Sequence, residues 1–93
     1  MINRVIITKD ADKQMKRAPS YIRDNLLNWR KEVELFGIRA VREHKSYHDE
    51  PLEGKRVGER SIRLSRQWRA FYCERENDIL IYVLEVTPHE YKK

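Results

Sequence analysis

Hydrophobic and polar residues recur along the N-terminal half in patterns that predict one strand and one short helix. Residues 4–8 include three consecutive β-branched aliphatic residues, which is typical of a buried strand. In residues 9–18, two apolar residues lie four positions apart among charged ones. We therefore expect an amphipathic helix that Thr8 caps and that ends before Pro19, because the residue before a proline avoids helical geometry.

A longer helix is predicted from Ser20 to Phe36. Apolar residues recur in it at intervals of three and four, as in a helix that packs on a core; they are Ile22, Leu26, Trp29, Val33 and Phe36. We interpret both aromatic residues of this stripe as core residues. Gly37 is expected to cap the helix, and residues 38–42 to add one or two further helical turns.

The C-terminal half predicts three antiparallel strands. Residues 60–64 alternate between polar and apolar, and an aromatic-rich run at 68–72 follows a three-residue loop at 65–67. Residues 79–86 are almost continuously apolar, so we expect a strand that is buried on both faces and central in the sheet. Residues 44–58 form a polar connection that is too long for a tight turn.

These elements predict an α+β fold: a small antiparallel sheet, mixed at its edge, with two to three N-terminal helices packed on one face. The other face is left free. The chain has 93 residues, so we expect a single domain spanning 1–93. Cys73 is the only cysteine, which rules out an intramolecular disulfide and fits a reducing compartment. We see neither a signal peptide nor a membrane span and expect a cytoplasmic protein without a membrane partner.

Charge adds a functional expectation to this fold. Lys and Arg number 20 and Asp and Glu 15, which gives a formal net charge of +5 and favours polyanionic partners. The three-residue loop would place Arg63 directly opposite Arg69 on one face of the hairpin. Two cations facing each other repel unless an anion lies between them, and a phosphate is the obvious anion.

Basic and aromatic residues around these two arginines suit single-stranded RNA, because cations follow phosphates and aromatic rings stack on unpaired bases. The candidate RNA-binding residues are Lys55, Arg56, Arg60, Arg66 and Trp68. For Lys55 and Arg56 taken individually, an ordinary solvated surface is the favoured alternative.

The C-terminal tail adds groups that can transfer protons. In an extended tail His89 and Tyr91 project to the same side and can meet the arginines. Considered alone, such residues are more often a frayed terminus. His48, in the polar connection, is a second candidate proton carrier. His44 and His48 have helical ligand spacing but lack a third ligand, so we predict no metal site and no cofactor.

Five segments carry a resemblance to a known family: PLEGKR at 51–56, ERSIRL at 59–64, WRAFY at 68–72, LEV at 84–86 and HEY at 89–91. In these segments the chain resembles the RelE/ParE superfamily of bacterial type II toxin-antitoxin toxins, most closely its HigB-like and RelE-like ribonuclease branch. The order and size of the elements agree along nearly the whole chain.

The resemblance implies helices packed on a curved antiparallel sheet. It also implies metal-independent cleavage of messenger RNA in the ribosomal A site, by attack of a ribose 2′-hydroxyl on the adjacent phosphate. Arg69 matches the arginine that stabilises the scissile phosphate, and Arg63 a second basic position. His89 and Tyr91 match acid/base and base-stacking positions, and Glu90 between them is a further acid/base candidate.

The leading hypothesis is therefore a toxin that acts as a ribosome-dependent mRNA endoribonuclease and inhibits translation. Its partners would be the ribosome, mRNA and a cognate antitoxin that covers the basic face in a toxin-antitoxin hetero-oligomer. Two alternatives stay open: a ParE-like poison of DNA gyrase without nuclease activity, and a non-catalytic module that binds RNA or the antitoxin.

Overall fold

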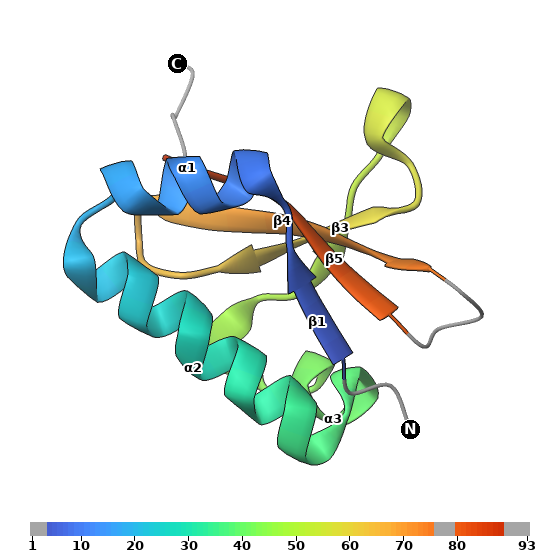
Figure 1. Cartoon of the computed structure of the whole chain (residues 1–93). Helices are drawn as coiled ribbons and strands as arrows, with labels where there is room; N and C mark the ends of the chain where they lie inside the picture. Colours follow the sequence, from blue (N-terminus) through green and yellow to red (C-terminus); the bar gives the residue numbers. More distant parts are fainter. Residues whose placement is uncertain (1–3, 76–79, 89–93) are drawn as a thin grey trace.

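The computed structural model describes residues 4–75 and 80–88. Its elements, in chain order, are β1 (Arg4–Ile7), α1 (Lys9–Arg17), α2 (Ser20–Phe36), α3 (Ile38–Arg42), η1 (Lys45–Tyr47), β2 (Glu50–Pro51), η2 (Gly54–Arg56), β3 (Glu59–Arg63), β4 (Trp68–Arg75) and β5 (Leu80–Pro88). The strands form one open, twisted sheet in the order β1-β5-β4-β3-β2 (Figure 1). No helix in the described part of the chain is both long and apolar enough to cross a membrane.

Strand β1 pairs with β5 in parallel, and every other neighbouring pair is antiparallel. The predicted mixed edge is thus β1. The predicted central strand, β5, is an interior strand between β1 and β4, but the middle strand of the five is β4. Burial of β5 on both faces was wrong. Ile81 and Val83 are fully buried toward the helices, whereas Tyr82 and Leu84 are half-buried, because the helices cover only one face.

The helices α1 and α2 form the layer on that face (Figure 1). Thr8 caps α1 as predicted, since its hydroxyl oxygen accepts from the Ala11 backbone N–H at 3.2 Å. The predicted stripe of α2 is buried from Ile22 to Val33, but Phe36 is 60% exposed, so its assignment to the core was wrong. Gly37, with φ 83°, ends the helix and turns the chain.

After that turn, apolar residues of α3 occupy the part of the core that Phe36 was expected to fill. Ile38 and Val41 are buried in the same core cluster as Trp29 and Val33 of α2. A left-handed φ is accessible to glycine at little cost, so the chain changes direction within one residue.

The hairpin of β3 and β4 has the predicted register. Arg63 lies opposite Arg69, and the Leu64 backbone N–H donates to the Trp68 carbonyl at 2.9 Å, which leaves the three-residue loop 65–67. Ile62 and Tyr72 point from this hairpin into the core and are fully buried.

The polar connection at 44–58 contains more structure than its sequence predicted. The two-residue strand β2 adds to the edge of β3, with Glu50 opposite Ser61 and Pro51 opposite Arg60. A strand of two residues, one charged and one proline, has no hydrophobic pattern to detect. The β5 strand also carries a bulge at Leu84, which has no partner in β4.

Candidate functional site

The face of the sheet that the helices leave uncovered carries the two arginines of the hairpin. Arg63 and Arg69 are half-buried, and the Arg69 Nη1 donates to the Ser61 hydroxyl oxygen at 3.3 Å. Within the described residues, neither guanidinium has a carboxylate at ion-pair distance. The predicted pair of facing cations is therefore present and has no counter-ion in this part of the chain.

The connection between α3 and β2 brings His48 to these arginines. His48 has a left-handed backbone, with φ 45° and ψ 49°, which is uncommon outside glycine. Its Nε2 lies 3.1 Å from the Arg63 Nη1. A guanidinium can only donate, so Nε2 must be the acceptor and is unprotonated in this contact. The Nε2 lone pair is engaged by Arg63 in this contact and becomes free for other chemistry only when the contact breaks.

The next residue, Asp49, attaches the connection between α3 and β2 to strands β3 and β4. Its side chain is fully buried, and its two oxygens accept from the Arg60 Nε and from the Tyr72 hydroxyl, both at 2.5 Å. The Arg42 Nε lies 3.9 Å from it, and Arg42 also donates to the Tyr72 oxygen at 3.2 Å and to Glu74. We call these five residues the Asp49 cluster.

Burial, and then the hydrogen bond to Asp49, raise the pKa of the Tyr72 hydroxyl above its ordinary value. Burial alone would lower the pKa of the Arg42 guanidinium, but its hydrogen bonds to Tyr72 and Glu74 raise it overall. Tyr72 therefore stays protonated near neutral pH and donates to Asp49. Both oxygens of the buried Asp49 carboxylate thus accept a hydrogen bond, as a buried carboxylate requires, and the cluster's other charged members reach partly to solvent.

Two of the predicted RNA-binding residues already have carboxylate partners. Arg60 donates to Asp49, and Arg56 donates to Glu59 at 2.9 Å and to Glu85 at 2.7 Å while its guanidinium lies over the Phe71 ring. These contacts give both arginines a role in holding the sheet and its connection together.

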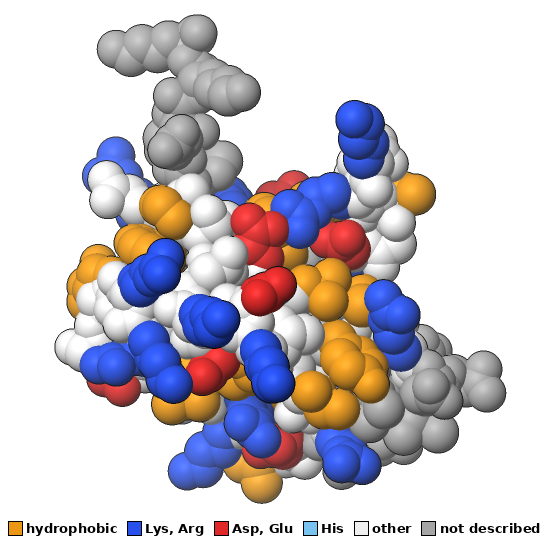
Figure 2. Space-filling model, turned by 45° about the horizontal axis from the view of Figure 1, so that its top comes forward, with side chains coloured by type: hydrophobic (Ala, Val, Ile, Leu, Met, Phe, Trp, Pro, Cys, Tyr) orange, Lys and Arg blue, Asp and Glu red, His pale blue; other side chains and the backbone are white. Residues whose placement is uncertain are grey.

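The other three predicted RNA-binding residues lie on different parts of the molecule. Lys55, in η2, and Arg66, in the hairpin loop, are exposed to solvent, whereas Trp68 is half-buried against the core. Further Lys and Arg side chains spread over the helical side of the molecule, with acidic ones among them (Figure 2). Positive charge is thus not confined to the hairpin.

The tail residues His89, Glu90 and Tyr91 lie outside the described residues, and their predicted roles stay predictions. The strand before them is placed: Thr87 lies opposite Arg69, and Pro88 opposite Trp68. The last described residue of β5, Pro88, therefore lies next to the residue that is opposite Arg69.

His44 is not brought to the arginines. Its Nδ1 lies 2.7 Å from the Ser46 hydroxyl oxygen, and its ring is tilted against Tyr47. In residues 4–75 and 80–88, no group of three or more His, Cys, Asp or Glu side chains is placed to hold a metal ion.

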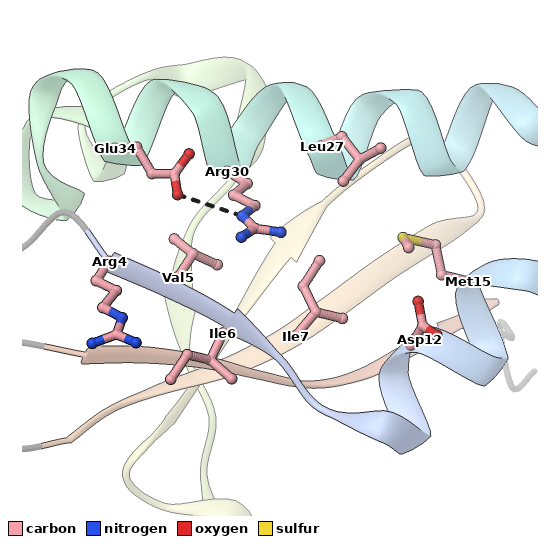
Figure 3. Close-up of a pocket in the computed structure, with 9 residues that line it drawn as sticks. All are labelled: Arg4, Val5, Ile6, Ile7, Asp12, Met15, Leu27, Arg30 and Glu34. Carbon is pink, nitrogen blue, oxygen red and sulfur yellow. Dashed lines mark ion pairs between the residues drawn. The ribbon is translucent and has the colours of Figure 1, made fainter.

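A hollow of about 530 Å³ lies between β1 and the helices, apart from every predicted site residue. Figure 3 shows Val5 and Ile7 of β1 facing Leu27 of α2, with the Arg30–Glu34 ion pair above them. Its walls combine apolar side chains with both basic and acidic ones, and it contains no pair of facing cations without a carboxylate. It therefore differs in chemistry from the arginine face.

Comparison with known proteins finds likeness only at the level of structure, because no family model and no curated protein sequence matches the chain. The archaeal RelE of the RelE–RelB complex from Pyrococcus horikoshii OT3 is similar, with a TM-score of 0.74 and 25% identity over 99% of this chain and 100% of that one. In the E. coli DinJ–YafQ toxin-antitoxin complex, the similar chain has a TM-score of 0.73 and 20% identity over 95% and 94% of the two chains.

A third similar structure is the toxin-antitoxin complex RelBE2 from Mycobacterium tuberculosis, with a TM-score of 0.70 and 18% identity over 97% of this chain and 100% of that one. The match extends along nearly the full length of each of these chains. The predicted likeness is confirmed: this chain has the α+β fold of the RelE/ParE superfamily of toxin-antitoxin toxins.

Proposed function

We propose that this chain is the toxin of a toxin-antitoxin system and that it cleaves messenger RNA on the ribosome. One observation carries the proposal: Arg63 and Arg69 face each other on the uncovered side of the sheet without a carboxylate partner among the described residues. By contrast, Arg42, Arg56 and Arg60 each have a carboxylate partner. A cation pair without a counter-ion is suited to bind a phosphate.

In the proposed reaction the two arginines hold the scissile phosphate and offset the charge that develops on its oxygens. A base removes the proton of the neighbouring 2′-hydroxyl, the O2′–P bond forms and the P–O5′ bond breaks. The products are a 2′,3′-cyclic phosphate and a 5′-hydroxyl that has taken up a proton. We propose His48 as the base, because its Nε2 lies 3.1 Å from the Arg63 Nη1, beside the proposed phosphate site; it would take the proton after Arg63 turns from it to the phosphate.

For the second proton we propose His89 or Tyr91, with Glu90 as a further candidate, on the resemblance of the tail to the ribonuclease branch. Thr87 lies opposite Arg69, so the tail begins beside the proposed phosphate site. Arg66 and Lys55, which are exposed, are proposed to attract the RNA at longer range.

The decisive experiment is tightly controlled expression followed by primer extension on a reporter message. We expect cuts at defined codon positions in a translated frame and none in the same message without a start codon. Arg69→Ala should remove the cuts, whereas Arg17→Ala, which changes an exposed cation of α1, should retain them. Equal cleavage by Arg69→Ala and the parent protein would exclude this mechanism.

A gyrase poison with the same fold is the second candidate, because the YoeB/ParE toxin from Agrobacterium tumefaciens is also similar in structure. Such a protein has no use for proton carriers beside the arginines. Removal of residues 89–93 separates the two: a nuclease loses cleavage, whereas a poison of gyrase still arrests DNA supercoiling in a purified assay. If message stays intact and neither assay responds, a non-catalytic binding module is left.

We also propose a cognate antitoxin as partner, because three of the similar structures are complexes of a toxin with its antitoxin. The antitoxin would cover the basic face. Co-expression of the gene next to this one should then restore growth, and the purified complex should protect Arg63 and Arg69 from phenylglyoxal. Unchanged modification of both residues in the complex would contradict this placement.

A further inference from the structure

A second hollow, smaller than the first, opens beside Arg63. It measures about 230 Å³ and is lined by Asn25, Asn28, Ser46, Tyr47, Arg63 and Leu64. It exists because β2 covers β3 only at Arg60 and Ser61, so α2 and η1 flank the rest of that edge instead. The hollow is therefore lined by α2, by η1 and by Arg63 of the proposed phosphate site.

Several groups around this hollow are held in place by the protein. The Asn25 Nδ2 donates to the Leu64 carbonyl at 2.7 Å, and the Tyr47 hydroxyl donates to Glu32. Burial, and then this hydrogen bond to Glu32, raise the pKa of the Tyr47 hydroxyl, so the tyrosine stays neutral near neutral pH. The hollow thus has an aromatic side chain and an amide that are each held by a hydrogen bond to the protein.

Hydrogen-bonding capacity remains unused in the same place. The Asn28 amide forms no hydrogen bond within the described residues, and the Oδ1 of Asn25 accepts none there. A side-chain amide presents a donor and an acceptor next to each other, which matches the edge of a nucleobase. The lining residues include no carboxylate, so nothing in the hollow repels a nucleic acid strand.

The volume indicates what the hollow can hold. Pockets for drug-sized ligands measure roughly 300–1,000 Å³, so this hollow accepts a smaller group, such as one planar base. Arg63 belongs to both the hollow and the facing arginine pair. A base held here would thus belong to a nucleotide next to the phosphate that Arg63 and Arg69 bind.

We propose that this hollow is a subsite for one unpaired base of the message, and that Asn28, with Asn25, favours adenine there. Asparagine pairs with the N6 and N7 atoms of adenine through two hydrogen bonds. Tyr47 and the Arg63 guanidinium provide surfaces on which an unpaired base stacks. The inference rests on the proposed function in so far as the base belongs to the cleaved strand.

The first test measures binding, without cleavage. Purified Arg69→Ala protein, full length, is titrated with 2′-O-methyl hexamers of adenine, uracil or cytosine. We expect the adenine hexamer to bind more tightly than the others, by about tenfold for one such two-bond contact, and Asn28→Ala in the same background to remove that preference. Equal binding of the three hexamers, or a preference that survives Asn28→Ala, overturns the subsite.

The second test measures the base next to each cut in a translated reporter library. Asn28→Ala should flatten the adenine preference while cleavage persists. Asp24→Ala is the matched control, because Asp24 is exposed on the same helix and does not line the hollow. An unchanged base distribution in Asn28→Ala overturns the subsite. Absence of cuts by the parent protein would instead contradict the proposed function and would leave the hexamer result to decide the subsite.

Discussion

Two groups of arginines on the same small sheet illustrate opposite uses of positive charge. In the Asp49 cluster, Arg42 and Arg60 surround a fully buried carboxylate, and Tyr72 completes its hydrogen bonds. In the facing pair, Arg63 and Arg69 have no carboxylate partner among the described residues. The first group fixes the connection to the sheet, and the second leaves its charge for a ligand.

The two groups are close in sequence, which shows why counting basic residues cannot separate them. Arg60 and Arg63 are three residues apart on β3, so their side chains point to opposite faces. Arg60 meets Asp49, whereas Arg63 meets His48. Adjacent residues of the connection therefore serve the two groups, and the Asp49 cluster holds His48 where it contacts Arg63.

Loss of the buried carboxylate should have the largest effect. Asp49→Ala leaves Arg60 and Tyr72 without their acceptor, so we expect the free energy of unfolding to fall by about 3–5 kcal/mol, the cost of breaking a buried pair. Urea denaturation measures it. As control, Asp12→Ala removes a partner of an exposed i,i+4 pair with Lys16 and should change stability by no more than about 0.5 kcal/mol. A loss in Asp49→Ala no larger than that expected for the control would show that the Asp49 cluster contributes little to stability.

Loss of one facing arginine should reduce cleavage strongly and should not reduce stability. Arg69→Ala should reduce cleavage by about 10²–10³-fold, as for other donors that stabilise a developing anion. Its stability should stay unchanged or rise by about 0.2–1 kcal/mol, because like charges opposite each other on a ladder repel. Single-turnover cleavage and urea denaturation are measured on the same protein. A marked loss of stability would place Arg69 with the structural arginines.

The salt dependence of RNA binding should separate Arg63 from Arg60. For single strands, the slope of log binding constant against log salt is about 0.7 per phosphate contacted. We expect Arg63→Gln to reduce the slope by about this amount and Arg60→Gln to leave it unchanged, because Asp49 already neutralises Arg60. Filter binding of a single-stranded RNA at several salt concentrations tests it. Equal slopes in the two variants would remove the distinction.

The smallest effect concerns stability at alkaline pH. The pKa of Tyr72 is raised by folding above its ordinary value of 10.0, so the folded protein keeps a proton that the unfolded chain loses. Its contribution is complete below about pH 10 and declines above it, by about 1.4 kcal/mol per pH unit. Tyr72→Phe should reduce the slope of the free energy of unfolding against pH by the share of one proton, about 1.4 kcal/mol per pH unit. Tyr47→Phe is an internal comparison, because the pKa of Tyr47 is also raised.

Local patterns predicted the elements that depend on neighbours in sequence. The cap at Thr8, the turn at Gly37 and the register of Arg63 with Arg69 each follow from a few consecutive residues, and the structure confirms them. Phe36 fits the helical stripe but lies outside the core, because the turn after it lets Ile38 take that place. The apolar stripe of a helix does not by itself show whether its last residue is covered by the rest of the protein.

The Asp49 cluster could not be predicted, because it joins residues that are distant in sequence. Asp49 resembles any other charge in a polar connection, and only the fold brings Arg42 and Tyr72 to it. The contact of His48 with Arg63 depends on the same long-range packing. Sequence identified His48 as a candidate on chemical grounds, and the geometry now gives it a specific partner.

The uneven covering of the sheet's two edges determines how another chain could join it. On one side, β2 and the bond from Asn25 to the Leu64 carbonyl occupy the edge of β3. On the other side, β1 is the outermost strand of the described sheet. An exposed edge is a template for an added strand. The edge at β1 offers four consecutive residues for pairing, whereas β2 offers two, one of them a proline without a backbone N–H. A strand added at β1 would lie three strands from β3 and would need a further segment to reach the arginines.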